Sequence, residues 1–137
     1  MEIRYGTVDV TDLGGLTLAD VLINVEADLE VWDGDRLIYS ERSFPIVELA
    51  RALCFWSRAD SADDFEFSSL SFEEPGVIEI HNTSKGWCVT SIFTPAVRSR
   101  IMQVGDVRGM IAGFVENVEC DLRRLGLIDI VAGWKVL

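Results

Sequence analysis

The fold of this chain depends first on residues 21–32, which have the sequence VLINVEADLEVW. Apolar side chains occupy every second position from Val21 to Val31, and the positions between them carry Leu22, Asn24, Glu26, Asp28, Glu30 and Trp32. A side-chain period of two is typical of a β-strand, in which successive side chains point to opposite faces. The pattern predicts one long strand over residues 21–32, with one buried face and one face in water.

The residues that follow predict a hairpin. Asp33-Gly34-Asp35 is a turn sequence, and residues 36–44 return as the partner strand. Residues 2–10 are expected to add a neighbouring strand.

Two registers of this hairpin are open. A two-residue turn at Asp-Gly would place Glu26 opposite Glu41. A three-residue loop would place Glu26 opposite Arg42 and would bring Leu37 and Tyr39 beside apolar residues of the first strand. Because burial determines register more strongly than turn preference does, the three-residue loop is favoured.

Two helices are predicted from the 3.6-residue period. The first starts at Pro45, where the missing N–H costs nothing, and its apolar stripe is Ile46, Leu49, Ala50, Leu53 and Trp56. The second starts after Asp106 as N-cap and ends before Gly126 as C′ residue. Its apolar stripe is Val107, Ile111, Phe114, Val118, Leu122 and Leu125.

Further strands are predicted between and after these helices. A strand from Phe65 changes its buried face at Ser68-Ser69, which indicates a bulge, and residues 77–81 and 86–93 form a second hairpin. Residues 94–105 fit a strand or a loop equally well. The tail, 127–137, is expected to form a short edge strand that carries Trp134.

These elements predict a single α+β domain over residues 1–137. Its expected architecture has two layers, an antiparallel sheet of about six strands carrying two helices, in the order β-β-β-α-β-β-β-(β)-α. A chain of 137 residues is long enough to bury a core without metals or disulfides.

Charge is uneven along the chain, which has a net charge of −11. The first 80 residues carry 18 acids and 5 bases, whereas the remaining residues carry 5 acids and 7 bases. A negative field repels nucleic acids and anionic membranes and attracts a basic partner protein. The alternative is that the acidity serves solubility alone.

Other sequence features bear on location. No apolar run has the roughly 18 residues that a spanning helix needs, and the start Met1–Tyr5 lacks the apolar core of a secretory signal, so a cytoplasmic location is expected. The three cysteines, Cys54, Cys88 and Cys120, form no CxxC pair and are expected to be buried thiols.

Motifs for catalysis are few. The single histidine, His81, has no GxSxG serine elbow with which to act and is expected to be an ordinary surface or half-buried residue. The sequence contains no zinc-ligand spacing, EF-hand loop, GxxxxGK[ST] or GxGxxG. We therefore expect no metal and no cofactor, and a non-catalytic protein is favoured over an enzyme.

Carboxylates remain as candidate functional groups. Glu26, Asp28 and Glu30 share one strand face at spacings of about 7 Å, set by the strand rise. Three interpretations are open: a solvated face, a stripe that binds a partner, and paired carboxylates for acid/base chemistry or cation binding. The expected partner-binding set adds an aromatic anchor and an acidic rim, and consists of Glu26, Asp28, Glu30, Trp32, Asp60, Asp63 and Asp64.

A row of glycines, Gly105, Gly109 and Gly113, recurs at every fourth residue. In the predicted final helix, Gly109 and Gly113 fall opposite the core stripe, where each glycine costs about 1 kcal/mol. The row reflects either chance and local packing or the close approach of a loop or of another chain, and the last of these would make the protein a homodimer.

The run Phe44–Trp56, FPIVELARALCFW, fits the pattern FPxxELAxxLxxW and is followed by DFEF at 64–67 and GWCVTSI at 86–92. This order resembles small uncharacterised actinobacterial proteins and, more loosely, is similar to the small acidic immunity proteins of bacterial polymorphic-toxin systems. The resemblance covers about residues 20–125. It implies an α+β fold and an interaction role, with a basic toxin as partner, and it implies no active site.

The function expected from these observations is a non-catalytic, acidic protein-binding module, immunity- or inhibitor-like, that binds a basic protein through the acidic strand face. The alternatives are a homo-oligomeric structural protein and a small ligand-binding or hydrolase domain that uses carboxylates.

Overall fold

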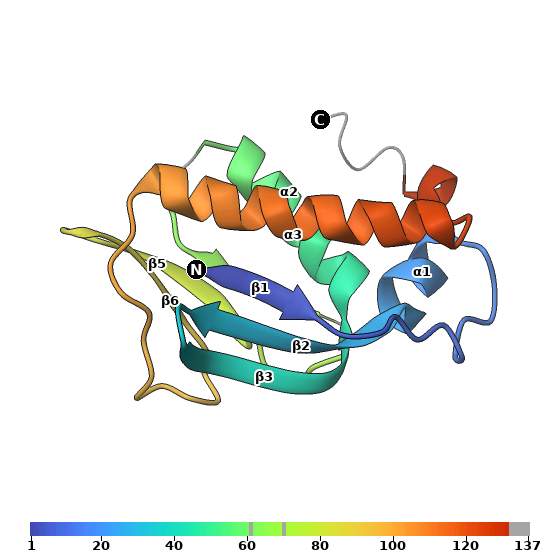
Figure 1. Ribbon diagram of the computed structural model, residues 1–137, viewed down its shortest axis with the longest axis horizontal. Coiled ribbons are helices and arrows are strands. Elements are labelled where there is room, and N and C mark those ends of the chain that lie inside the picture. Colours follow the sequence, from blue (N-terminus) through green and yellow to red (C-terminus); the bar gives the residue numbers. More distant parts are fainter. Residues whose placement is uncertain (61, 70, 132–137) are drawn as a thin grey trace.

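The computed structural model describes residues 1–60, 62–69 and 71–131, which form an α+β fold (Figure 1). The strands are β1 (Glu2–Tyr5), β2 (Glu26–Asp33), β3 (Arg36–Pro45), β4 (Phe65–Glu66), β5 (Glu79–Thr83) and β6 (Gly86–Thr90). The helices are α1 (Leu18–Asn24), α2 (Ile46–Arg58) and α3 (Val104–Arg124), followed by a short 3-10 helix, η1 (Ile128–Ile130).

The strands pair antiparallel in two sheets, with the orders β1-β2-β3 and β4-β5-β6. Figure 1 shows α2 and α3 on the same side of the first sheet. The predicted α+β class is confirmed. The predicted element order is wrong, because the described strands divide into two sheets of three and an additional helix, α1, precedes β2.

The first half of the predicted long strand is helical. The Oγ1 atom of Thr17 accepts the backbone N–H of Asp20 at 3.2 Å and so caps α1. Leu18, Val21 and Leu22 also fit a helical period, and Val21 is fully buried. The prediction of a single strand over residues 21–32 was therefore wrong before residue 26, because local capping overrides an alternation that suits both structures.

The register of the β2–β3 hairpin differs from both expected registers. A two-residue turn, Gly34-Asp35, joins the strands, with Gly34 at the positive φ of 63° that type II′ turns require. Glu26 lies opposite Pro45, because β3 has one extra residue at each of two irregularities. At the first irregularity the consecutive residues Ile38 and Tyr39 are both buried, because the bulge turns both side chains away from water.

The second irregularity involves Ser43, whose φ is 51°. Its backbone N–H donates to Oδ1 of Asp28 on β2 at 3.1 Å. A side chain of the acidic face thus supports the bulge that directs Phe44 into the core, where this ring is fully buried.

Both predicted helices form, and the start of each needs a correction. α2 begins at Ile46, one residue later than predicted, with Pro45 as its N-cap, and its stripe is buried apart from Trp56, which is half-buried. α3 begins at Val104 with Gln103 as N-cap, and Asp106 is the third helical residue, which completes a capping box with Gln103. The predicted N-cap was therefore three residues late. Gly126 follows α3 at the expected positive φ, 74°.

The remaining strands are shorter than predicted. β4 ends at Glu66, and a turn stabilised by the Ser71 N–H on Oγ of Ser69 replaces the predicted continuation past a bulge. The second hairpin is confirmed, with Ser84-Lys85 as its turn. Residues 94–103 are irregular except for a bridge between Trp87 and Met102.

The expected edge strand of the tail is wrong where the structure describes it, since η1 occupies residues 128–130, and Trp134 lies outside the described residues. Of the three cysteines, Cys54 and Cys88 are buried as expected, whereas Cys120 is exposed.

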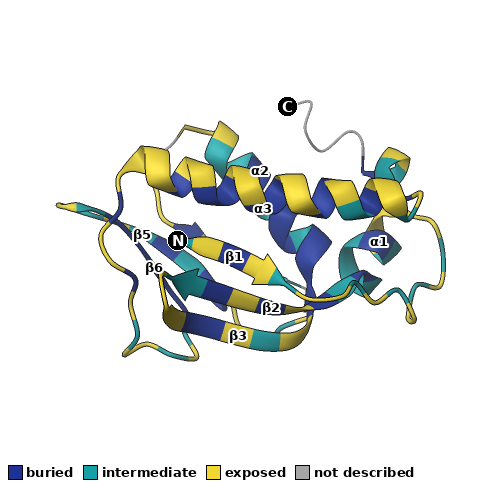
Figure 2. Cartoon of the chain, in the orientation of Figure 1, coloured by how far each residue is buried: buried dark blue, intermediate teal, exposed yellow. Residues whose placement is uncertain are grey.

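One hydrophobic core joins the two sheets. The ring of Phe44 on β3 lies 5.6 Å from that of Phe67 and 5.5 Å from that of Phe72, centroid to centroid, and both partners follow β4. Figure 2 shows buried residues on α2 and α3 and on strands of both sheets. Phe44 therefore connects the first sheet to the second through aromatic packing.

Replacement of Phe44 by alanine tests this connection. We expect Phe44→Ala to lower the free energy of unfolding by about 3–5 kcal/mol, because a fully buried ring leaves a cavity. Urea denaturation measures the loss. Phe93→Ala is the control, since Phe93 is 54% exposed and its removal should cost about 1 kcal/mol or less. Equal losses in the two variants would contradict the role assigned to Phe44.

Candidate functional site

The acidic side chains of β2 lie on the face of the first sheet that points away from α2 and α3. Ala27, Leu29 and Val31 are each at most 3% exposed, and the alternation along β2 is visible in Figure 2. Glu26 is half-buried, whereas Asp28 and Glu30 are exposed. We call these three carboxylates, Glu26, Asp28 and Glu30, the acidic stripe.

The loop after β1 adds two further acids to one end of the stripe. The backbones of Asp9 and Glu26 exchange two hydrogen bonds, of 2.7 and 3.0 Å. Burial, and then the negative charges of Asp12 and Asp9, raise the pKa of the Glu26 carboxyl. We call Asp9, Asp12 and Glu26 the acidic cluster; it was not predicted, because the pattern of residues 2–12 gives no sign that this loop bridges to β2.

The carboxylates of this face form no ion pairs among the described residues, although Arg4 on β1 lies directly opposite Glu30. No ion pair joins the acidic stripe, Asp9 or Asp12 to any residue in the part of the chain that the structure describes. Asp28 accepts the Ser43 N–H and Asp9 accepts the Thr11 N–H, both from neutral backbone groups. The face therefore carries negative charge that the molecule itself does not neutralise by contact.

Two open depressions meet at Asp28. One, of about 640 Å³, is lined by the loop after β1 together with Glu26, Asp28 and Ser43. The other, of about 550 Å³, lies between Gly6 and β3 and is lined by Glu30, Glu41 and other residues.

Trp32 lies at the far end of the same face. Its indole is half-buried, and the guanidinium of Arg4 lies 5.5 Å from the ring centroid. The indole Nε1 is buried and has no hydrogen-bond partner among the described residues. Arg4 also pairs with Glu2 at 3.0 Å, so this end of the face is mixed in charge.

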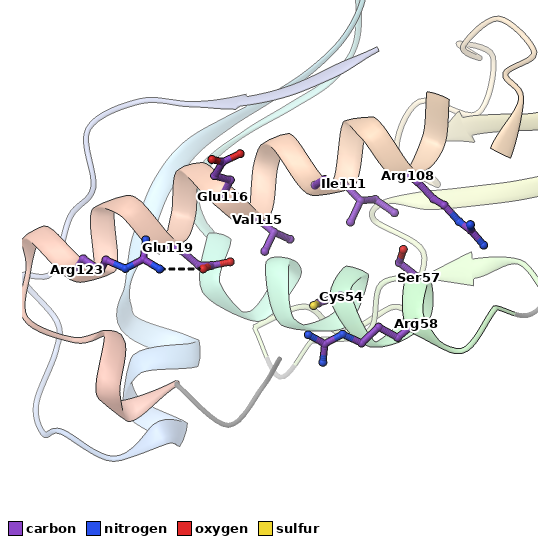
Figure 3. Close-up of a pocket in the computed structure, with 10 residues that line it drawn as sticks. Cys54, Ser57, Arg58, Arg108, Ile111, Val115, Glu116, Glu119 and Arg123 are labelled. Carbon is purple, nitrogen blue, oxygen red and sulfur yellow. Dashed lines mark hydrogen bonds and ion pairs between the residues drawn. The ribbon is translucent and has the colours of Figure 1, made fainter. Parts of the chain in front are cut away.

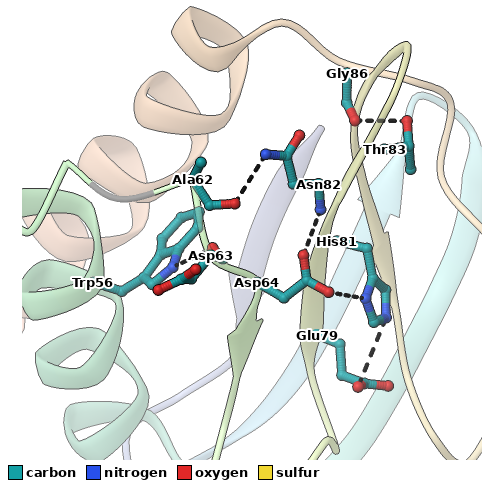
Figure 4. A network of polar contacts seen from close by, with 9 residues as sticks. All are labelled: Trp56, Ala62, Asp63, Asp64, Glu79, His81, Asn82, Thr83 and Gly86. Carbon is teal, nitrogen blue, oxygen red and sulfur yellow. Dashed lines mark hydrogen bonds and ion pairs between the residues drawn. The ribbon is translucent and has the colours of Figure 1, made fainter.

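The other predicted site residues, Asp60, Asp63 and Asp64, lie elsewhere, in the loop between α2 and β4. The carboxylate of Asp64 accepts the Asn82 N–H at 2.7 Å and contacts Nδ1 of His81 at 2.9 Å (Figure 4). The backbone carbonyl of Asp63 accepts the indole N–H of Trp56, and Asp60 pairs with Arg108. The structure does not bring this loop together with the acidic stripe.

His81 is half-buried and lies between two carboxylates. Its Nε2 is 3.7 Å from Glu79, opposite the contact with Asp64. The Asn82 N–H, and then the His81 ring, lower the pKa of Asp64. These contacts fasten the α2–β4 loop to β5, which is a structural role.

A groove between α2 and α3 was missed by the sequence analysis. It has a volume of about 500 Å³, with Cys54, Ile111 and Val115 along it and with Arg58, Arg108 and Arg123 at its rim (Figure 3). Glu119, only 5% exposed, lies in it 3.4 Å from Arg123. The sequence offered one signal for this groove, which is the position of Glu119 one helical turn after Val115 on the buried side of α3. A carboxylate at such a position needs polar or charged partners nearby.

Two general features bear on the kind of site. In residues 1–60, 62–69 and 71–131, no three His, Cys, Asp or Glu side chains converge as metal ligands would. Within the same residues no helix is both long and apolar enough to cross a membrane.

The family model described as "Domain of unknown function (DUF7878)" matches residues 3–124. The chain belongs to this family. The matched range includes β1 from Ile3 onward, the acidic stripe and the whole of α3. No curated protein and no solved structure matches the chain.

The pKa of Asp64 leads to a prediction for stability. A lowered pKa stabilises the fold above the ordinary pKa of the carboxyl, and this stability is lost as pH falls through the lowered value. Asp64→Asn should therefore lower the free energy of unfolding at pH 7 and lower it less at pH 3, as measured by urea denaturation. Asp35→Asn, in the exposed turn, is the control. A loss for Asp64→Asn that does not change with pH would contradict the assignment.

Glu26 should behave in the opposite way. Because its pKa is raised, the native state holds this proton more tightly than the unfolded chain, and stability falls as pH rises through that range. Glu26→Gln should therefore raise the melting temperature at pH 7 and leave it nearly unchanged at pH 3. Glu30→Gln, which removes a carboxylate opposite Arg4, should give no increase. A lower melting temperature for Glu26→Gln at pH 7 would show that Glu26 is not under repulsion.

Proposed function

We propose that this protein is a non-catalytic, acidic protein-binding module, immunity- or inhibitor-like, which binds a basic protein through the acidic stripe. The observation that carries the proposal is a cluster of acids, Asp9, Asp12 and Glu26, that no described cation pairs with. Burial, and then the charges of Asp12 and Asp9, raise the pKa of Glu26. A lysine or arginine of a partner would neutralise these acids on binding. Relief of their mutual repulsion would then contribute favourably to the free energy of binding.

The shape of the face supports the same proposal. A two-layer arrangement with helices on one side leaves the outer face of β1-β2-β3 free for a partner. The side chains of Glu26, Asp28 and Glu30 repeat at about 7 Å, the distance between alternate residues of an extended segment. The depressions on both sides of Asp28 give room for long basic side chains.

The charge of the first 80 residues would speed association with such a partner, because long-range attraction raises the rate of encounter. Asp60, Asp63 and Asp64 contribute to this field, while their contacts hold the α2–β4 loop. Trp32, packed beneath Arg4, forms the apolar end of the contact surface.

The resemblance to immunity proteins supports a basic toxin as the partner and the bacterial cytoplasm as the location. Both are part of this proposal and rest on analogy of charge and sequence pattern.

A second candidate function is small-molecule binding in the groove between α2 and α3. Its volume of about 500 Å³ falls within the range of roughly 300–1,000 Å³ that is typical of ligand pockets. The buried Glu119 beside Arg123 would orient a polar ligand. Saturable binding of a small molecule, abolished by Val115→Trp, would favour this candidate.

The test of the main proposal is affinity capture from a lysate of the source cells at low and high salt. The wild-type protein should retain a basic protein at low salt, and the variant Glu26→Lys/Asp28→Lys/Glu30→Lys should not. With the purified partner, the association rate constant should fall by about tenfold or more in this variant at low salt, and by much less at high salt.

Two further variants make the result specific. Glu66→Lys/Glu73→Lys/Glu74→Lys changes net charge by the same amount at exposed positions near the second sheet and should retain the partner. The variant Glu26→Lys/Glu30→Lys keeps the contact between Asp28 and Ser43. It should nevertheless fail to retain the partner. Equal effects of both triple variants would mean that net charge alone matters, and unchanged capture by the stripe variants would refute the surface.

A further inference from the structure

Strand β1 is an open edge of the first sheet. The Gly6 N–H donates to the carbonyl of Asp28 at 3.0 Å, and this bond sets the phase of the antiparallel ladder. Glu2 and Arg4 direct their backbone groups to β2, whereas Ile3 and Tyr5 direct theirs to the open edge. Among the described residues, no hydrogen bond reaches the outward N–H and C=O groups of Ile3 and Tyr5. Such an edge is a template for a further strand.

The charges on this edge are self-complementary. Glu2 and Arg4 flank Ile3 and lie on the outer face, with side chains 59% and 49% exposed. If a second copy pairs antiparallel with Ile3 opposite Ile3, then Glu2 of each copy lies opposite Arg4 of the other. Opposite charges directly across a strand pair stabilise it. The alternative register, with Ile3 opposite Tyr5, would place the two Arg4 side chains against each other.

The glycine row lies directly beside this edge. A trough of about 450 Å³ runs between β1 and α3 and is lined by Ile3, Gly105, Gly109 and Gly113 together with other residues. A Cβ atom added at any of these three glycines would meet nothing within 4 Å. Packing within one molecule therefore does not require glycine there, although glycine is unfavourable on an exposed helix surface.

A two-fold axis would place the β1 edge and the glycine row of α3 in one continuous surface. Antiparallel pairing of β1 with a second copy needs a two-fold axis perpendicular to the sheet, and this axis keeps the helices of both copies on the same side. The two α3 helices then run antiparallel beside each other, with the glycine rows between them. Small residues at a helix contact allow the backbones to approach closely.

We propose that the β1 edge and the glycine row of α3 together form a homodimer interface, with Ile3 on the two-fold axis and two reciprocal Glu2–Arg4 pairs. A four-residue strand buries too little surface for a stable dimer, which needs on the order of 1,000 Å² in total. The contact along α3 supplies the rest. Tyr5 holds the two elements in position, since its hydroxyl donates to Asp121 of α3 at 2.6 Å. This inference does not depend on the proposed function.

The test is the mass in solution from micromolar to millimolar concentration, measured by analytical ultracentrifugation. The wild-type mass should rise with concentration from 15.3 kDa toward twice that value. Gly109→Leu/Gly113→Leu should weaken dimerisation by about tenfold or more, because its side chains separate the helices. Ala112→Leu adds bulk at an exposed position on the α2 side of α3 and should leave the dimer unchanged.

Charge variants test the register. Arg4→Glu places like charges opposite each other and should abolish the dimer, whereas Glu2→Arg/Arg4→Glu restores complementarity and should recover it. A wild-type protein that stays monomeric at all concentrations would overturn the proposal. So would a dimer that is insensitive to both the glycine and the Arg4 variants. Reversal of the acidic stripe at Glu26 and Asp28 should not weaken the dimer, which separates this test from that of partner binding.

Discussion

Burial of one face of β2 is the constraint on which the rest of the structure depends. β2 is the middle strand of its sheet, and its residues Ala27, Leu29 and Val31 are almost fully buried. Because side chains alternate, this burial leaves only the outer face for Glu26, Asp28 and Glu30. A slip of one residue would exchange the two sets and bury three carboxylates, at a large cost in solvation. The core therefore determines where the acidic stripe lies.

Much of this arrangement could be predicted, because burial leaves a periodic trace in the sequence. The alternation from Val25 onward, the stripe of α2 and that of α3 each follow from contact with one core. Local hydrogen bonds, in contrast, produce no periodic pattern in the sequence. The hydroxyl of Thr17 begins α1 within an alternating run, and the left-handed Ser43, held by Asp28, shifts a register that hydrophobicity alone cannot specify.

The candidate site was predictable to the same extent and for the same reason. Its residues on β2 were found because they alternate with the core. Asp9 and Asp12 were not found, because their approach to Glu26 depends on a backbone bridge between a loop and a strand. The groove between α2 and α3 depends on tertiary packing of two helices, and Glu119 was its one visible sign in the sequence.

The acids of this chain divide into two kinds by what surrounds them. Asp60 and Asp64 have partners within the molecule, in Arg108 and in the His81 side chain and Asn82 backbone. The contacts of Asp64 lower its pKa, so its ionised form stabilises the fold. The carboxyl of Glu26 does the reverse, since its ionised form is disfavoured by burial and by its neighbours. Charge that opposes the stability of its own fold is unfavourable for folding alone. The proposed binding of a partner protein would explain why it is present.

The geometry of the first sheet also allows the two proposed surfaces to coexist. A partner on the acidic stripe would use the outer face of the middle strand, whereas a second copy would use the edge strand and the helix beside it. Edge pairing adds strands in the plane of the sheet and covers neither face. The outer faces of two copies would then form one surface with an acidic stripe on each half. Binding of a basic partner at one stripe would reduce the repulsion between two chains that each carry a net charge of −11, so the two interactions would favour each other.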